Sequence, residues 1–196
     1  YINYGYKIIY EYVDNIDESL SGKITKSLIR NFKYCIKKDA YITTTANKLY
    51  DNVLLNNKSA KVKLITNGCD YEHFHNNCKY SKPNDLNHSK PIVGYYGALA
   101  SWFDYDLIKE LNHTNKYNII LIGQNYDNSL TTSGILDLEN VYYLGRKEYD
   151  ELPKYLAYFD VAMIPFLINE ITLSTSPVKL FEYMSGGKPI VTTDLP

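Results

Sequence analysis

The residues PIVGYYGALASWFDYDLIKELNHTNKYNIILIG (91–123) are the most informative about the fold. They open with an apolar run at Ile92–Tyr96 and close with another at Tyr117–Ile122, and each run is followed by a glycine. Between them, Asp104–His113 has apolar residues at helical spacing and starts with aspartate, a good helix N-cap. Three of its side chains are expected to face inward: Leu107, Ile108 and Leu111. A strand, a helix and a strand in this order predict neighbouring parallel strands.

The same alternation continues on both sides of this stretch. Downstream, strands are predicted at Val141–Leu144, Val161–Phe166 and Pro189–Thr193, and helices at Glu151–Phe159 and Pro177–Ser185. Upstream, strands are predicted at Lys7–Val13, Tyr41–Thr45 and Lys61–Thr66, and helices at Ser21–Lys38 and Ala46–Leu55. Residues 70–90 are polar and aperiodic, which favours a loop and a linker.

The chain is therefore predicted to be α/β, with two Rossmann-like, doubly wound parallel-sheet domains. Neither domain looks complete, since the first half has only about three strands and the second stops just after its fifth. We assign residues 1–80 to the first domain, 81–90 to a linker and 91–196 to the second domain. The chain opens with Tyr1 rather than Met, so we expect it to be a piece of a longer protein, truncated at both ends.

Composition excludes several classes of protein. The net charge is -1, whereas a nucleic-acid-binding protein needs a basic surplus. Three cysteines are too few for a disulfide framework, which favours a reducing, cytoplasmic setting. No segment has the signal-peptide pattern or the roughly 18 apolar residues of a membrane span.

The segment TLSTSPVKLFEYMSGGKPIVTT (172–193) carries the clearest chemical signal. Ser176 is a predicted N-cap, and Pro177 suits the first helical position. The free N–H groups at such a helix start can bind a phosphate or diphosphate, and Glu182, one turn on, could accept hydrogen bonds from a ribose diol. The alternative is an ordinary amphipathic helix with a surface pair between Lys179 and Glu182.

The end of the chain, SPVKLFEYMSGGKPIVTTDLP (176–196), resembles the donor-site signature of GT-B glycosyltransferases, in the retaining group that builds polysaccharides and glycolipids. Other parts resemble the same family in the same order. These parts are VDNIDESLSG (13–22), KKDAYITTTANKL (37–49), KVKLITNGCDYEHF (61–74), residues 91–111 and NVYYLGRKEYDELPKYLAYFDVAMIPF (140–166).

This resemblance implies a donor site. The glutamate that grips the donor ribose in the family falls on Glu182, whereas the family's sugar-contacting glutamate, eight positions earlier, is replaced by Ser174. The stretch Ala98–Asp104 lacks the family's usual arginine and lysine, so Lys179 is the first choice to neutralise the diphosphate. The full set of expected donor-binding residues is Gly97, Ala98, Arg146, Lys147, Ser174, Thr175, Ser176, Lys179, Leu180 and Glu182. The base is expected near Arg146–Tyr149.

The resemblance also implies the activity, which is transfer of a hexose-like unit from a nucleoside-diphosphate sugar to a glycan or lipid-linked acceptor, with retention and without a cofactor. The family's acceptor-side glycine loop and histidine would precede Tyr1. We therefore assign no catalytic residue and expect this chain alone to bind a nucleotide weakly and to turn over poorly. Two alternatives stay open, namely a related nucleotide-sugar epimerase and a non-catalytic nucleotide-binding or scaffold module.

Two further features suggest other ligands. Cys69, His73, His75 and Cys78 cluster, but their spacing matches no common zinc site. Asp14, Asp17 and Glu18 could bind a cation, but solvated acids at a strand end are the simpler interpretation, and the chemistry of the resembling family is usually metal-independent, so we expect no metal. The predicted helix Ser21–Lys38 carries six basic residues and no acidic one. It either is a solvated face or touches an anionic membrane, as at the inner face of the cell membrane.

Overall fold

The protein is described by a computed structural model, which covers residues 5–15, 26–37, 40–75, 79–86 and 89–196. The chain divides into two compact units. The first unit comprises Tyr1–Asn67, Ile168–Ser176 and Leu195–Pro196, and the second comprises Gly68–Leu167 and Pro177–Asp194. The assignment of residues 1–80 and 91–196 to two domains of a larger fold stays a prediction.

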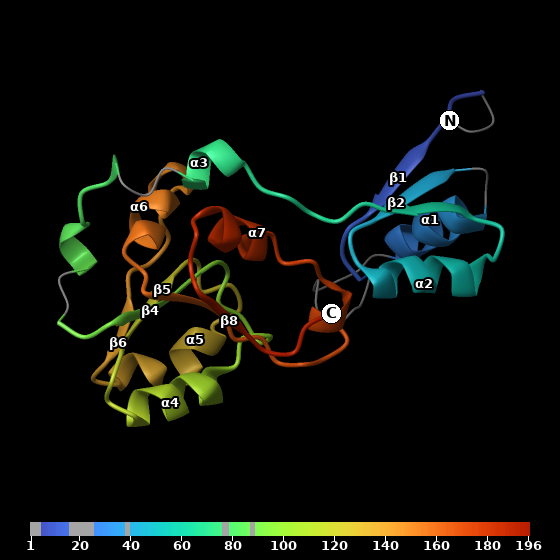
Figure 1. Cartoon of the computed structure of the whole chain (residues 1–196). Coiled ribbons are helices and arrows are strands. Elements are labelled where there is room, and N and C mark those ends of the chain that lie inside the picture. Colours follow the sequence, from blue (N-terminus) through green and yellow to red (C-terminus); the bar gives the residue numbers. More distant parts are fainter. Residues whose placement is uncertain (1–4, 16–25, 38–39, 76–78, 87–88) are drawn as a thin grey trace. The chain divides into compact units, whose positions relative to one another are not determined.

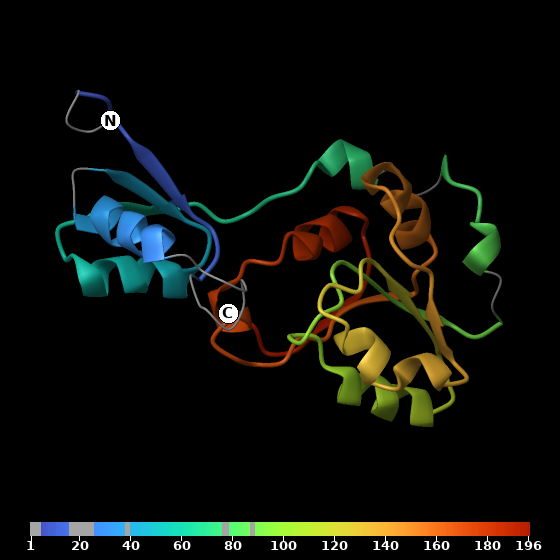
Figure 2. The same ribbon diagram turned by 180° about the vertical axis from the view of Figure 1, so that it is seen from behind.

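The first unit contains a parallel sheet in the order β1-β2-β3, formed by β1 (Ile9–Tyr12), β2 (Tyr41–Thr44) and β3 (Lys61–Leu64). The helices α1 (Lys26–Lys37) and α2 (Asn47–Asn56) lie along the same face of this sheet (Figures 1 and 2). The connections β1-α1-β2 and β2-α2-β3 both move in the same direction across the sheet. Because crossovers between parallel strands are right-handed, both helices lie on the same face.

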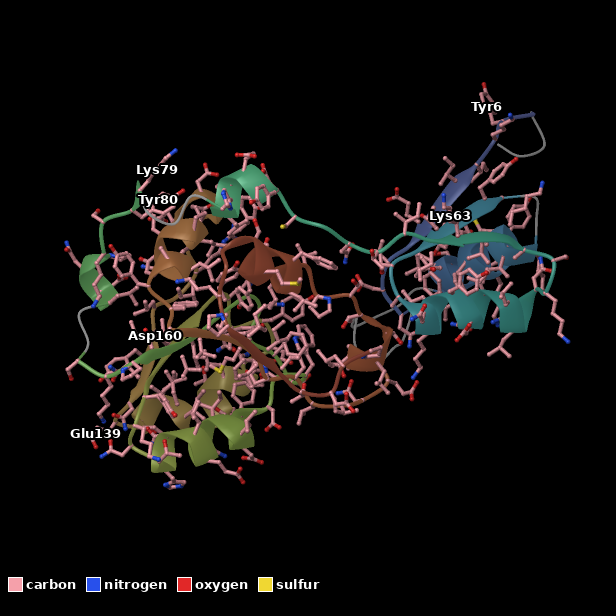
Figure 3. All side chains as sticks on the ribbon, viewed as in Figure 1. Tyr6, Lys63, Lys79, Tyr80, Glu139 and Asp160 are labelled. Atoms are coloured by element: carbon pink, nitrogen blue, oxygen red, sulfur yellow. The ribbon has the colours of Figure 1, made fainter. Side chains whose placement is uncertain are left out.

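Strand alternation separates the two faces of this small sheet. Tyr12 and Ile42 point to the helices and are buried with Leu49 of α2 in one apolar core. The side chains of Ile9 and Lys63 point to the opposite face of the sheet, and Lys63 lies on the side away from the helices (Figure 3). The strands are thus half-buried, as their mixed sequences require.

The second unit is built on a five-stranded parallel sheet in the order β6-β5-β4-β7-β8. Its strands are β4 (Ile92–Tyr96), β5 (Asn118–Ile122), β6 (Val141–Tyr143), β7 (Val161–Ile164) and β8 (Ile190–Thr192). Every residue of β4 and β5 is buried, which explains why these two runs are almost purely apolar. The strand order reverses at β4, which therefore marks the topological switch point.

Helices cover both faces of this sheet (Figures 1 and 2). The helices α4 (Tyr105–His113) and α5 (Ser129–Thr132) lie on one face, and α6 (Leu152–Ala157) and α7 (Val178–Ser185) lie on the other. A further helix, α3 (Tyr71–His75), packs against α7. Short 3-10 turns complete the unit: η3 (Asn84–Leu86), η4 (Ile135–Asp137) and η5 (Tyr149–Glu151). Another turn, η6 (Thr172–Ser174), belongs to the first unit.

Several local predictions are confirmed. All eight predicted strands are present, and both sheets are parallel. Asp104 caps α4 by accepting a hydrogen bond from the Leu107 N–H at 3.0 Å. Pro153 lies in the first turn of α6, where the missing proline N–H costs nothing.

Three local predictions are wrong. Residues 70–90 are not all loop, because they include the helix α3. This helix is stabilised by the complete burial of Phe74 and by a hydrogen bond from the His73 N–H to the Asp70 carboxylate at its start. Ser176 is not the N-cap of α7, since Pro177 keeps an extended ψ of 115° and the helix starts at Val178. Leu107 is 39% exposed rather than inward, because α4 leaves an apolar groove beside the sheet open.

Candidate functional site

Two glycines form the floor of a pocket at the carboxyl ends of β4 and β5. Gly97 follows β4 with a φ of 141°, and Gly123 follows β5 with a φ of 147°, a region that favours glycine. A Cβ on Gly123 would lie 1.8 Å from the carbonyl oxygen of Gly97. A Cβ on Gly97 would lie 2.8 Å from the Cε of Lys179. The two strand ends can approach each other, and Lys179 can reach them, only because no side chain intervenes.

The pocket has a volume of about 360 Å³, and we call it the strand-end pocket. Its walls come from the residues that follow three adjacent strands and from the first turns of α7. They are Tyr96, Gly97, Ala98, Ile122, Gly123, Gln124, Arg146, Lys147, Leu152, Val178, Lys179 and Glu182. A pocket beyond the carboxyl ends of parallel strands, at the switch point, is where doubly wound sheets bind their ligands.

Lys179 provides a positive charge held close to the glycine floor. Its Nζ lies 4.8 Å from the centre of the Phe166 ring and 5.5 Å from that of Tyr95. Lys179 is not among the ion pairs of the described residues. Burial lowers its pKa to about 8, although the charge of Glu182 acts in the opposite direction. An anion in the pocket would offset the cost of this desolvation by its opposite charge, so the position suits a phosphate group.

Glu182 provides a buried hydrogen-bond acceptor in the same pocket. It is 6% exposed. Burial raises the pKa of its carboxyl group, and the Tyr96 hydroxyl and the positive charges of Lys179 and His73 pull it down again. A carboxylate in such surroundings is suited to accept hydrogen bonds from paired hydroxyl groups of a ligand.

Arg146 and Lys147 occupy the rim of the pocket in different ways. The Nζ of Lys147 lies 2.8 Å from the Asp85 carboxylate, which also accepts from the Tyr155 hydroxyl at 3.0 Å. The hydrogen bond to Asp85 is the main cause that raises the pKa of Lys147, and Tyr155 adds to it. Arg146 is exposed, and its guanidinium lies 3.8 Å from Glu148. Lys147 is thus tied to η3, whereas Arg146 keeps most of its donors toward solvent.

The strand-end pocket brings together six of the predicted donor-binding residues. They are Gly97, Ala98, Arg146, Lys147, Lys179 and Glu182. Leu180 is absent from the pocket lining, and its N–H bonds to the Pro177 carbonyl at 3.0 Å.

The remaining predicted residues, Ser174, Thr175 and Ser176, belong to the first unit. The Ser174 hydroxyl donates to the Glu170 carbonyl at 2.7 Å, and the Thr175 hydroxyl donates to the Thr172 carbonyl at 2.9 Å. The Ser176 carbonyl accepts from the Asn67 side chain at 2.6 Å. The first two contacts form a local turn before α7, and the third ties that segment to Asn67. Their role toward a donor stays a prediction.

Six residues that line the pocket were not in the expected donor-binding set: Tyr96, Ile122, Gly123, Gln124, Leu152 and Val178. Tyr96 ends an apolar strand that is buried on both faces, so no alternation in the sequence distinguishes it from its neighbours. Gln124 directly follows Gly123, and its place after a strand-ending glycine was the only available signal.

The histidines near α3 serve packing. The His73 ring stacks on Tyr149 with centroids 4.7 Å apart, and His75 stacks on Tyr71 at 4.5 Å. Within the described ranges, no group of three or more His, Cys, Asp or Glu side chains could hold a metal ion. Cys78, Asp17 and Glu18 lie outside those ranges.

Comparison with known proteins adds a family context. The family model of Glycosyl transferases group 1 matches residues 90–196, more than half of the chain. A curated relative from Bacillus subtilis (strain 168), "Putative teichuronic acid biosynthesis glycosyltransferase TuaH", is 27% identical over 204 residues. The match covers 97% of this chain and 51% of the relative, so the chain spans about half of that protein's length.

Two solved structures share the fold. Anabaena Alr3699/HepE, solved in complex with UDP-glucose, is 19% identical with a TM-score of 0.65, over 96% of this chain and 54% of that one. WaaG, a glycosyltransferase involved in lipopolysaccharide biosynthesis, is 13% identical with a TM-score of 0.65, over 95% of this chain and 56% of that one. These likenesses confirm the predicted α/β fold of the GT-B type.

Proposed function

This chain belongs to the Glycosyl transferases group 1 family, and we propose that it is part of a glycosyltransferase of polysaccharide biosynthesis. The enzyme would move a sugar from a nucleoside-diphosphate sugar to a glycan or lipid-linked acceptor. The relative and WaaG are both named glycosyltransferases, and HepE was solved with a nucleotide sugar, UDP-glucose, which agrees with this class of activity. The observation that carries the proposal is the strand-end pocket, which holds a cation over a glycine floor and a buried carboxylate beside it.

Different residues of the pocket would bind different parts of a nucleotide sugar. Lys179 faces Gly97, so a diphosphate on the glycine floor would meet its ammonium group. Glu182 would accept hydrogen bonds from the ribose hydroxyls, and Arg146 would lie near the base or the outer phosphate. Holding the departing diphosphate between fixed charges stabilises the charge that grows on it as the sugar leaves.

We further propose that the transferred unit is a hexose and that transfer proceeds with retention. In that mechanism the departing diphosphate helps to deprotonate the acceptor, so cations near the diphosphate are more important than a general base. The pocket lining is consistent with this mechanism, because it contains three cationic residues (Arg146, Lys147 and Lys179), a single carboxylate and no histidine. The epimerase alternative would need several such acid–base groups and has no support from this lining.

The same lining supports a reaction without a metal or cofactor. Mg²⁺ prefers several oxygen ligands, whereas Glu182 is the single acidic residue among the pocket's walls. We expect nucleotide affinity to be unchanged in EDTA. A large loss of affinity on chelation, restored by added Mg²⁺, would contradict this part of the proposal.

A binding panel tests the central proposal. Trp102 is the only tryptophan of the chain and follows the pocket residues Gly97 and Ala98 on the same loop. We expect its fluorescence to change with UDP, GDP or ADP, and one base to be preferred when the corresponding nucleotide sugars are compared. Absence of binding to every member, checked by calorimetry, would instead favour a scaffold module.

We also propose that helix α1 lets the protein touch an anionic membrane. Its exposed basic residues recur at spacings of four, three and four and so lie along one side of the helix: Lys26, Arg30, Lys33 and Lys37. The helix has no acidic residue, and Leu28 and Tyr34 are also exposed. Each basic residue near an anionic surface contributes about 1 kcal/mol of attraction. None of the helices in the described ranges is long and apolar enough to cross a membrane.

Vesicle flotation tests this contact. The protein should float with phosphatidylglycerol vesicles at low salt, and replacing the four basic residues of α1 by glutamine should abolish flotation. The matched control replaces four exposed lysines elsewhere by glutamine: Lys58, Lys79, Lys82 and Lys116. Equal losses in both variants would show only a general charge effect and would remove the membrane proposal.

A further inference from the structure

The hydroxyl group of Tyr96 is buried without a hydrogen-bond partner. Tyr96 is the last residue of β4 and is 3% exposed. Among the described residues, three buried side-chain atoms lack a partner: Thr44 Oγ1, Tyr96 Oη and Asn125 Oδ1. Of these three residues, Tyr96 is the one that lines the strand-end pocket. Because buried tyrosine hydroxyls normally find a partner, an unpaired one beside a pocket points to a ligand atom.

Neighbouring groups fix the Tyr96 ring. The Tyr183 ring meets it edge-on, with centroids 4.8 Å apart, and the Phe74 ring is stacked with it at 6.4 Å. The Tyr96 backbone N–H donates to the Tyr183 hydroxyl at 3.1 Å. The ring is thus held by α7 and α3 and cannot readily turn its hydroxyl toward another protein group.

The unpaired hydroxyl lies beside the carboxyl group of Glu182. Burial raises the pKa of that carboxyl group and the nearby hydroxyl lowers it only in part, and the hydroxyl is not within hydrogen-bond geometry of any described protein group. Lys179 on α7 and His73 on α3 also act on Glu182. Burial is the main cause that raises the pKa of Tyr149 and of Cys69, and the negative charge of Glu182 adds to it. Tyr96 therefore supplies an uncharged donor and acceptor next to the carboxylate.

We propose that the Tyr96 hydroxyl is a second ribose-binding group, which shares the sugar's two adjacent hydroxyls with Glu182. This inference rests on the proposed nucleotide-sugar site and adds a residue to it. One ribose hydroxyl donates to Glu182, and the other bonds to the Tyr96 oxygen. The bound ribose then satisfies a group that is unpaired in the empty pocket. A deoxyribose lacks one of these hydroxyls and leaves a buried polar group unsatisfied, so the site selects ribonucleotides.

A thermodynamic cycle tests this contact. Calorimetry would measure the affinities of UDP, GDP and ADP for the whole chain, and then those of the 2′-deoxy and 3′-deoxy forms of the tightest binder. The same ligands would be measured with Tyr96→Phe. We expect this variant to bind the ribonucleotide about 5- to 10-fold more weakly, as for one lost hydrogen bond. We expect it to bind one of the two deoxy analogues as tightly as the unaltered protein does.

The control variant is Tyr105→Phe, which removes the hydroxyl that bonds to Ser129 at 2.8 Å; Tyr105 is not among the residues that line the pocket. It should leave all affinities unchanged. Thermal unfolding provides a second control, because Tyr96→Phe removes an unsatisfied polar group and should not lower the Tm.

The outcomes separate the inference from the function on which it rests. Equal losses for the ribonucleotide and both deoxy analogues, or no loss at all, would overturn the role of Tyr96 while the nucleotide site stands. If the unaltered chain binds no nucleotide, the proposed function fails and the inference fails with it.

Discussion

The two ionisable residues of α7 in the strand-end pocket are both disfavoured in their charged forms by burial. Lys179 lies over aromatic rings, and its pKa falls to about 8. Glu182 lines the same pocket and is buried, and this burial raises the pKa of its carboxyl group above the ordinary value of 4.5. A protein interior holds such groups at a cost in stability, which is typical of residues kept for a ligand rather than for folding. Both residues therefore give predictions in which affinity and stability change in opposite directions.

Replacing Lys179 by methionine should weaken nucleoside-diphosphate binding about 10-fold or more, because a charge-assisted hydrogen bond is lost. Affinity of the unaltered protein should fall as the pH rises through about 8, where the ammonium group loses its proton. Between about pH 8 and 10.5 the unfolded chain binds more protons at this residue than the folded chain, so stability should rise with pH there.

The Lys179→Met variant should lack both pH dependences. Calorimetric titrations and urea unfolding from pH 7 to 10 measure the two effects, and Lys109→Met on α4 is the control. An affinity that is flat through pH 8 in the unaltered protein would contradict the assigned role of this ammonium group.

Replacing Glu182 by glutamine should weaken nucleotide binding about 10-fold, because an amide accepts hydrogen bonds with one oxygen instead of two. The raised pKa of Glu182 means that its favourable contribution to stability is present when it is protonated, and is lost as the pH rises through that pKa. Glu182→Gln should therefore keep or raise the Tm at pH 7. The exposed Glu110→Gln is the control. A variant that is less stable and yet binds normally would show that Glu182 has a structural role.

The secondary-structure elements differ in how well the sequence predicts them. The wholly buried β4 and β5 are continuous apolar runs and were predicted to the residue or nearly so. The helix α3 was missed because it has five residues, too few for a periodic pattern, and its stability depends on burying Phe74. Likewise, the ion pair of Lys147 with Asp85 joins residues far apart in the sequence, so no local pattern could show that Lys147 is already paired. Lys179 and Glu182 were predictable because a cap-like segment and a family signature surround them.

One steric prediction belongs to the packing of β4 against the segment after α6. Gly94 lies in the middle of β4, and a Cβ there would lie 2.3 Å from the Phe159 ring. Gly94→Ala should therefore lower the free energy of unfolding by about 1–3 kcal/mol, as overpacking of a core does. Gly68→Ala is the matched control, because a Cβ at Gly68 meets no atom within 4 Å. Urea unfolding measures both variants, and equal stability would show that Phe159 moves aside without cost.

The strand-end pocket and the small sheet belong to different compact units. Every residue that lines the strand-end pocket belongs to the second unit. The first unit has its own core, formed around Tyr12, Ile42 and Leu49. A ligand that binds the pocket is therefore coupled directly to the stability of the second unit alone.

We expect a bound nucleotide to stabilise the second unit selectively. At a ligand concentration of 100 times the Kd, the gain is about 2.7 kcal/mol. Hydrogen exchange should slow in the residues after β4 and β5 and in α7, and should stay unchanged in the strands β1, β2 and β3. The amides of β2, the central strand of the small sheet, serve as the internal reference. Equal slowing in both units would contradict a pocket confined to the second one.

The all-parallel strand order of the second unit has a consequence for biosynthesis. The central strand β4 leaves the ribosome with both edges unpaired, and its neighbour β7 follows some 65 residues later. No hairpin can cover β4 in the meantime, because parallel neighbours require a crossover. The nascent chain therefore carries an apolar, unpaired edge for several seconds at ordinary translation speeds. Since α7 is translated after β7, the strand-end pocket is complete only after this interval, so a ligand of the pocket cannot stabilise the chain during it.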